Sequence, residues 1–185
     1  MKYIPIVGIG LAIWGLVTQD WFKVGFGVIL FLTGFAVDLF KKKGVMKDDK
    51  VFQLYKVVSQ IVHTVRESLD SDKDSSKSKL AQGLFFLGLV DGASQSAGMS
   101  EEQFNSLFRS VFADLDHIFD ESYQDKLLHF HNNSSPEHSA LPAIIKGGEL
   151  FINFAKGNSM APLAGGMLVE ELINSSSFPS SINEL

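Results

Sequence analysis

Two apolar runs fill the first 40 residues and constrain the fold more than any other feature of the sequence. The runs, residues 4–17 and 24–37, are separated by six residues, and residues 1–40 contain only four charged side chains. With their flanks they extend over about residues 3–19 and 22–40, which is roughly 25–29 Å of helix each. So short a linker joins only antiparallel helices. The sequence therefore predicts a transmembrane helical hairpin in residues 1–40.

Side chains within the two runs fit this interpretation. Tyr3 and Trp21 lie at the ends of the predicted spans, where aromatic rings prefer the headgroup layer. Small residues at helical spacing let two membrane helices approach closely and pack. A re-entrant or monotopic hairpin remains open as an alternative to full spanning. The candidate helix-packing residues are Gly8, Ala12, Gly15, Gly27 and Gly34.

A cluster of lysines follows the second run and predicts the orientation of the hairpin. Lys41, Lys42 and Lys43 begin a basic juxtamembrane segment at residues 41–50. Because basic residues concentrate on the cytoplasmic side of membrane spans, we expect two spans in the inner membrane with both termini in the cytoplasm. The same three ammonium groups are candidates for contact with anionic lipid headgroups.

The charge and composition of the remaining chain exclude several classes of function. The whole chain has 16 basic and 21 acidic residues, and residues 51–185 contain 9 basic and 17 acidic ones. So acidic a body argues against a nucleic-acid partner, whose phosphates must be neutralised. The chain contains no cysteine, which excludes disulfides, thiol nucleophiles and thiolate zinc sites. The mean hydropathy of +0.14 is an average of an apolar hairpin and an acidic domain.

Residues 51–174 have the periodicity of helices and lack the alternation of strands. Apolar residues recur every three or four positions from Val51 to Leu69, which is typical of an amphipathic helix. Ser100 and Gln103 form a capping box at the start of another helix. The sequence predicts an all-α cytoplasmic helical bundle with a polar linker at residues 70–79 and a disordered tail at 175–185. Further helices are expected at about residues 79–90, 100–119, 122–131, 142–155 and 167–173.

An internal pseudo-repeat is a further expectation. Residues 83–94 can be laid over residues 148–159 without a gap, with identical glycine, phenylalanine, glycine and serine at four positions. In each copy we expect an apolar helix that stops at a glycine, here Gly92 and Gly157, followed by a loop and a second helix. A helix-turn-helix unit of this kind cannot bury its apolar face alone and pairs with its twin.

Two short acidic stretches, Leu-Val-Asp-Gly at residues 89–92 and Ser-Glu-Glu at 100–102, carry a resemblance to the TerB-like (tellurite-resistance) helical domains. The resemblance covers parts of residues 80–175 and implies an all-α fold that carries this element twice. It also implies metal binding through Asp91, Glu101 and Glu102. The loop between the stretches is longer than in the family. Lys156 stands in the second copy where the family has an acidic residue.

Other chemistry-bearing patterns are weak. His117, His129, His131 and His138 fall within 22 residues, but two histidines that are two positions apart on a helix point in different directions. Solvent-exposed polar histidines are the simpler interpretation, and a metal in this region stays open. Phosphate-binding loops, nucleophile elbows and zinc-protease motifs do not occur in the sequence. We therefore expect no enzyme, no catalytic residue, no cofactor and no small-molecule substrate.

These observations predict a membrane-anchored helical module that binds another protein as an adaptor or regulator. Its expected partners are membrane lipid and either a protein or a second copy of the chain. A second hypothesis makes the hairpin itself active, as a holin-like pore or as an immunity or exclusion factor in the membrane. A third, which the resemblance suggests, is a TerB-like metal-binding domain of the stress response.

Overall fold

The structure is a computed structural model that describes residues 49–70 and 72–185. The predicted hairpin, its candidate packing residues and Lys41, Lys42 and Lys43 lie outside the described residues. None of the helices formed by the described part of the chain is both long enough and apolar enough to span a membrane.

Within residues 49–70 and 72–185 every regular element is a helix, which confirms the all-α prediction for this part of the chain. The short 3₁₀ helix η1 (Ile182–Glu184) ends the chain. The helices at residues 49–67, 121–133 and 141–155 lie within two residues of their predicted positions, because the apolar periodicity that predicts them is also what buries them. The helix predicted at 79–90 extends to residue 96, the one predicted at 100–119 ends at residue 113, and the one predicted at 167–173 begins at residue 161. The α-helices are α3 (Asp49–Glu67), α4 (Ser76–Ser96), α5 (Glu101–Ala113), α6 (Glu121–Asn133), α7 (Leu141–Ala155) and α8 (Ala161–Asn174).

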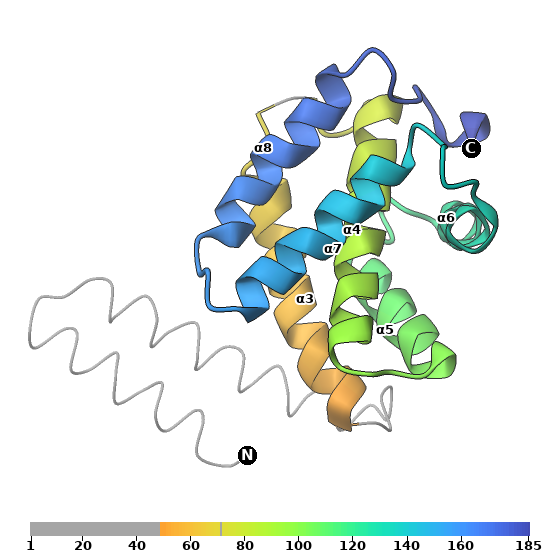
Figure 1. Cartoon of the computed structure of the whole chain (residues 1–185). Helices are drawn as coiled ribbons and strands as arrows, with labels where there is room; N and C mark the ends of the chain where they lie inside the picture. Colours follow the sequence, from red (N-terminus) through yellow and green to blue (C-terminus); the bar gives the residue numbers. More distant parts are fainter. Residues whose placement is uncertain (1–48, 71) are drawn as a thin grey trace, which may run out of the picture. The chain divides into compact units, whose positions relative to one another are not determined.

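Helix α4 is the centre of the domain. It is apolar on all sides, and 15 of its 21 residues are buried, so it has no face left for solvent. It contacts α7 and α8 as well as α5 and α6. Figure 1 shows α7 crossing α4, with α8 beyond it and α5 and α6 on the other side. Helices α5, α6, α7 and α8 each cover part of α4.

Glycines bring α4 and α7 together almost backbone to backbone. A Cβ atom at Gly88 would lie 2.0 Å from the carbonyl oxygen of Ile144, and one at Gly147 would lie 2.0 Å from that of Phe85. Gly92 faces the backbone of Gly148 in the same way, at 2.9 Å. No residue larger than glycine fits these separations. The close packing of α4 on α7 therefore requires glycine at these positions.

Phenylalanines fill the opposite side of α4. Phe112 of α5 is fully buried, and its ring centroid lies 4.3 Å from that of Phe108 and 5.4 Å from that of Phe119. Phe119 in turn packs edge to face on Phe86 of α4, with 6.5 Å between centroids. Each such side chain contributes roughly 1.5–3 kcal/mol through burial. This side of the core is held by large rings in contact.

Helix α3 is joined to the rest of the domain at both ends. Near its start, the Tyr55 hydroxyl donates to both carboxylate oxygens of Asp114, at 3.0 and 2.9 Å, and Ser59 donates to the same carboxylate at 3.0 Å. Near its end, Gly165 of α8 lies so close to Val65 that an added Cβ would stand 2.5 Å from the valine methyl. Polar contacts thus fix one end of α3 and close packing the other.

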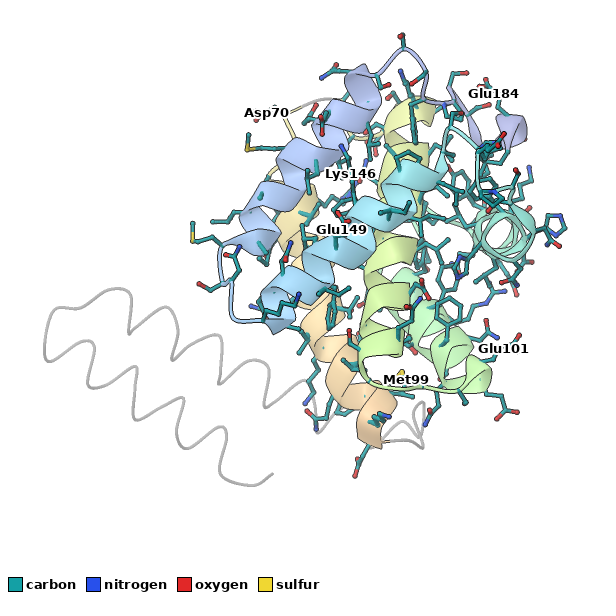
Figure 2. The ribbon with its side chains drawn as sticks, viewed as in Figure 1. Asp70, Met99, Glu101, Lys146, Glu149 and Glu184 are labelled. Atoms are coloured by element: carbon teal, nitrogen blue, oxygen red, sulfur yellow. The ribbon has the colours of Figure 1, made fainter. Side chains whose placement is uncertain are left out.

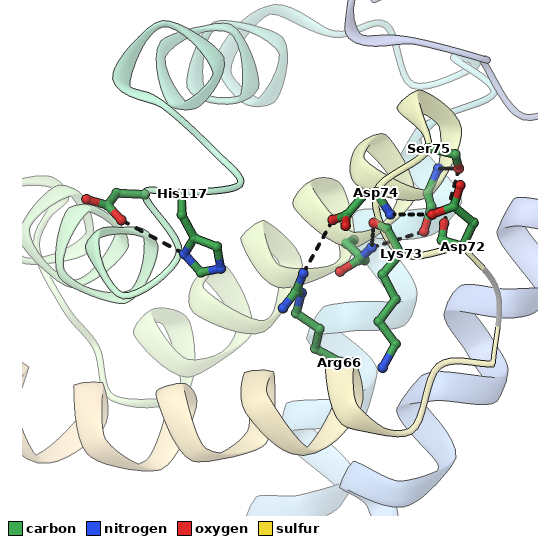
Figure 3. A network of polar contacts seen from close by, with 9 residues as sticks. Arg66, Asp72, Lys73, Asp74, Ser75 and His117 are labelled. Atoms are coloured by element: carbon green, nitrogen blue, oxygen red, sulfur yellow. Dashed lines mark hydrogen bonds and ion pairs between the residues drawn. The ribbon is translucent and has the colours of Figure 1, made fainter.

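The polar segment before α4 is shorter and more ordered than the predicted linker. Helix α4 begins at Ser76, three residues earlier than expected, because Ser75 caps it by accepting a hydrogen bond from a backbone amide of the first turn. The carboxylate of Asp72 accepts from the backbone amide of Asp74 at 3.1 Å, and Arg66 pairs with Asp74 at 3.6 Å (Figure 3). Local side-chain acceptors organise this turn.

The end of α4 also differs from the prediction. The helix does not stop at Gly92 but runs to Ser96, and the residue with positive φ that follows it is Gly98, at φ +57°. Helix α7 does end next to its predicted glycine, Gly157, at φ +99°. Helices α4 and α7 do pair, as expected of the two copies. The gapless alignment nevertheless pairs a glycine inside one helix with a glycine that terminates the other.

The C-terminal segment is packed, in contrast to the predicted disordered tail at residues 175–185. Phe178 is buried, with 5% of its surface exposed. The ammonium group of Lys77 donates to the carbonyl of Ser175 at 2.7 Å, and that of Lys126 donates to the side chain of Asn183 at 3.0 Å. One buried phenylalanine and two lysine hydrogen bonds thus hold this serine-rich segment on the domain.

Candidate functional site

A shallow cleft opens where the end of α4, the start of α5 and the end of α6 meet. Its volume is about 220 Å³. The α4–α5 loop forms one edge with Met99, and Figure 2 shows Met99 and Glu101 at that end of the molecule. We call this feature the Asp91 cleft. Its lining includes Asp91, Ser94, Gln95, Glu101, Phe104, Asn105, His131 and Asn132.

Asp91 and His131 form the centre of the Asp91 cleft. One carboxylate oxygen of Asp91 accepts a hydrogen bond from the side chain of Gln95 at 2.8 Å, one turn further along α4. The other lies 3.8 Å from Nε2 of His131, and this contact is an ion pair only while the imidazole is protonated. The His131 ring also packs on Phe104, with 5.6 Å between centroids. Three helices therefore supply one carboxylate and two adjacent rings.

The local sequence explains how α5 reaches the Asp91 cleft. Ser100 caps α5, and its hydroxyl accepts from the backbone amide of Gln103 at 3.3 Å while the Gln103 side chain accepts from the Ser100 amide at 3.0 Å. This confirms the predicted capping box. The cap fixes the first turn, and that turn carries Glu101 and Phe104 into the cleft wall.

Ser94 is the most deeply buried polar group of the Asp91 cleft. Only 4% of its surface is exposed. Its hydroxyl has no hydrogen-bond partner among the residues that the structure describes. Buried hydroxyls almost always have a partner, so this oxygen is an unsatisfied group beside Asp91.

The three acidic residues implied by the TerB resemblance separate in the structure. Asp91 and Glu101 line the same cleft, whereas Glu102 is exposed and does not belong to the lining. In the described ranges, 49–70 and 72–185, the side chains of His, Asp and Glu do not gather in groups of three that could hold a metal ion. Metal binding through Asp91, Glu101 and Glu102 stays a prediction.

The four clustered histidines occupy four different environments. His131 lies in the Asp91 cleft. His138 packs edge to face on Phe130, with 4.9 Å between centroids, and accepts from a backbone amide. His129 contacts Asn133 on the outer face of α6, and His117 is exposed beside its neighbour in sequence. Proximity in the sequence thus does not become proximity in space.

A second candidate site is an apolar surface on α8. Met160, Leu163 and Met167 follow one another at helical spacing and are 63%, 51% and 76% exposed. Leu163 and Val57 of α3 line one groove between the two helices. We call these four residues the α8 apolar surface. Large apolar side chains that are exposed together on a protein surface are characteristic of interaction sites.

Both candidate sites contain residues that the sequence interpretation missed. His131 is 40 positions from Asp91, and no local pattern connects a residue of α6 with one of α4. The α8 apolar surface did leave a signal, because Met160, Leu163 and Met167 have the spacing of one helix face. That spacing indicates a face but does not reveal whether it is buried.

The chain matches no protein-family model, no curated protein and no solved structure. The resemblance to TerB-like domains is therefore carried by residues 89–92 and 100–102 alone.

Proposed function

We propose that the chain is a membrane-anchored helical module that binds another protein and has no catalytic activity of its own. In this proposal residues 1–40 form the two-span anchor in the inner membrane, and the helical domain acts in the cytoplasm. The observation that carries the proposal is the exposure of the α8 apolar surface, whose most exposed side chain, Met167, is 76% exposed.

The chemistry of the α8 apolar surface favours a protein as the occupant. Two of its four side chains are methionines, whose flexible thioethers adapt to the irregular apolar face of a partner helix. A lipid surface is disfavoured, because residues 51–185 contain 17 acidic and only 9 basic side chains and the inner leaflet is anionic. The expected partner therefore has an apolar helix face bordered by basic residues.

Site-specific photocrosslinking in living cells tests this proposal. A photoreactive amino acid placed at Met167 of the full chain should give one discrete crosslinked protein. The matched control carries the same group at Glu121, which is exposed at the start of α6. Leu163→Asp should abolish the product from position 167 and leave the helical circular dichroism unchanged. A product of twice the mass of the chain identifies a second copy as the partner.

Two results would contradict the proposal. The first is crosslinking to lipid alone from position 167. The second is an equal yield from position 121, since a specific surface must differ from an arbitrary exposed one. Enzymatic turnover by the purified chain would contradict the statement that it has no catalytic activity.

A second candidate function is metal binding, favoured by the placement of Asp91 and Glu101 in one cleft. Calorimetric titration of the full chain in detergent with Mn²⁺, Mg²⁺, Ca²⁺ and Zn²⁺ tests it. Asp91→Asn should remove any specific binding, because each carboxylate contributes both a ligand and a charge.

A further inference from the structure

We propose that the Asp91 cleft binds one guanidinium group, carried by an arginine side chain of the partner protein. This inference rests on the proposed function, since it assigns a basic residue of that partner to a specific place on the domain. The α8 apolar surface and the Asp91 cleft would then recognise different parts of the same partner.

The hydrogen-bonding groups of the cleft fit a cation with many donors. Asp91 and Glu101 supply carboxylate oxygens from α4 and α5, and Asn132 adds an amide oxygen from α6. The described residues that line the cleft include no lysine and no arginine. A guanidinium presents five N–H donors and no acceptor. The lining thus offers acceptors where this group carries donors.

The buried hydroxyl of Ser94 is an independent indication that a ligand belongs here. Ser94 lines the cleft, and only 4% of its surface is exposed. Its oxygen has no partner within the described part of the chain. Rotation of the Ser94 side chain toward the cleft would bring this shielded oxygen within reach of a bound N–H donor, beside the Asp91 carboxylate on the preceding turn of α4.

The shape of the cleft selects a small planar group. Phe104 and His131 lie ring against ring at 5.6 Å and form an aromatic wall, on which a guanidinium plane stacks favourably. The volume of about 220 Å³ is below the roughly 300–1,000 Å³ of pockets that hold drug-sized ligands. One side-chain head group fits this size, and an ammonium group lacks the planar face to use the wall.

Methionine methyl groups allow a direct test on the full chain in detergent micelles. The chain has five methionines, of which Met99 lines the cleft and Met160 and Met167 lie on the α8 apolar surface. With ¹³C-methyl-labelled methionine, titration with N-acetylarginine amide should shift the Met99 resonance saturably. The resonances of Met160 and Met167 should not move. N-acetylnorleucine amide, which lacks the charge, should shift none of them.

Three variants locate the binding group. Asp91→Asn should weaken binding by roughly tenfold or more, because charge-assisted hydrogen bonds are the strong ones. Ser94→Ala should weaken it by roughly threefold to tenfold and should not harm folding, because it removes a hydroxyl without a partner. Glu102→Gln is the matched control: it removes an adjacent exposed carboxylate outside the cleft and should leave the affinity unchanged.

Several outcomes overturn the inference. A Met99 resonance that does not respond to N-acetylarginine amide at roughly 10 mM, a concentration that would detect even weak binding, contradicts the guanidinium site. Binding of agmatine without binding of N-acetylarginine amide assigns the cleft to a free small cation instead. Selective broadening of Met99 by Mn²⁺, with no response to the arginine amide, assigns it to a metal.

The two proposals can fail separately. A crosslinked partner at position 167 together with a silent Met99 removes the guanidinium site and leaves the protein-binding function. A Met99 resonance that responds, without any crosslinked protein at position 167, removes the protein-binding function and leaves a guanidinium site in the cleft. A crosslinked partner whose yield falls severalfold with Asp91→Asn supports both.

Discussion

The two sides of α4 are packed by opposite means. Toward α7, glycines remove side chains, and two helix backbones meet directly at Gly88 and Gly147. Toward α5 and α6, rings such as Phe112 fill the space between backbones that lie further apart. The first side is sensitive to any atom that is added and the second to any atom that is removed. Substitutions on each side should separate the two kinds of packing, and substitutions outside them should have smaller effects.

The largest effect is expected at Gly147. Gly147→Ala places a Cβ atom 2.0 Å from the carbonyl oxygen of Phe85, so α4 and α7 must separate, and we expect a loss of at least about 3 kcal/mol of unfolding free energy. Gly148→Ala is the matched control, because its nearest atom is 3.5 Å away. It should be neutral or stabilise the helix by up to about 1 kcal/mol. Thermal unfolding followed by circular dichroism measures both, and equal effects would break the contrast.

Removal of atoms on the other side should come next. Phe112→Ala leaves a cavity among Phe108 and Phe119 and should lower the unfolding free energy by about 3–5 kcal/mol. Phe112→Leu retains most of the volume and should lower it by less than about 1.5 kcal/mol. The two variants should therefore differ in unfolding free energy. A difference smaller than about 1 kcal/mol, which is the contribution of roughly one buried methylene group, would show that this side tolerates voids.

The attachment of α3 gives a smaller, pH-dependent effect. Burial, and then the nearby carboxylate of Asp114, raise the pKa of Tyr55 above its ordinary value of 10.0. The unfolded chain therefore loses this proton first, and stability should fall as the pH rises above 10. The contribution of Tyr55 to the slope is at most about 1.4 kcal/mol per pH unit, and less where solvent reaches the ring.

Chemical unfolding at pH 9, 10 and 11, a series chosen around the ordinary tyrosine pKa of about 10, measures this slope. Tyr55→Phe should flatten it, although burial also raises the pKa of Tyr123, so part of the slope should remain. A profile that is identical in the variant would show that Tyr55 ionises as easily in the folded protein as in the unfolded chain.

The smallest effect on stability is expected outside both sides of the core. Met167 is 76% exposed, so Met167→Ser should change the unfolding free energy by less than about 0.5 kcal/mol. The same substitution should reduce capture of a partner at the α8 apolar surface by roughly tenfold, as expected for an apolar anchor. A large loss of stability would identify this surface as part of the fold.

The contrast also explains which parts of the fold were accessible from the sequence. The phenylalanine side follows a helical period of apolar residues, and such a period predicts a helix over residues 100–119. Helix α5 forms the part of it from Glu101 to Ala113. The glycine side gives an ambiguous signal, because glycine both terminates helices and permits close approach. Gly92 was interpreted as a terminator and is a spacer, and this single ambiguity moved the predicted end of α4 by six residues.

The sequence also predicts part of the candidate site and misses the rest. Asp91 and Glu101 were singled out because their stretches resemble a known element, and the structure places both in one cleft. His131 stands out in the sequence only as one of the clustered histidines, because no local pattern links a residue of α6 with Asp91 of α4. Ser94 is a common residue type whose importance comes from its burial. For the packed C-terminal segment, the serine-rich composition predicts disorder, whereas the buried ring of Phe178 and the hydrogen bonds from Lys77 and Lys126 hold it on the domain.

The burial of 15 of the 21 residues of α4 has a consequence for the synthesis of the protein. Ser96, the last residue of α4, is made 78 residues before Asn174, the last residue of α8. At roughly 5–20 residues per second, the most deeply buried helix of the domain waits about 4–16 s for the helices that cover it. Apolar surface that stays uncovered during translation is prone to aggregation, so variants that slow elongation after residue 96 should increase aggregation without altering the finished fold.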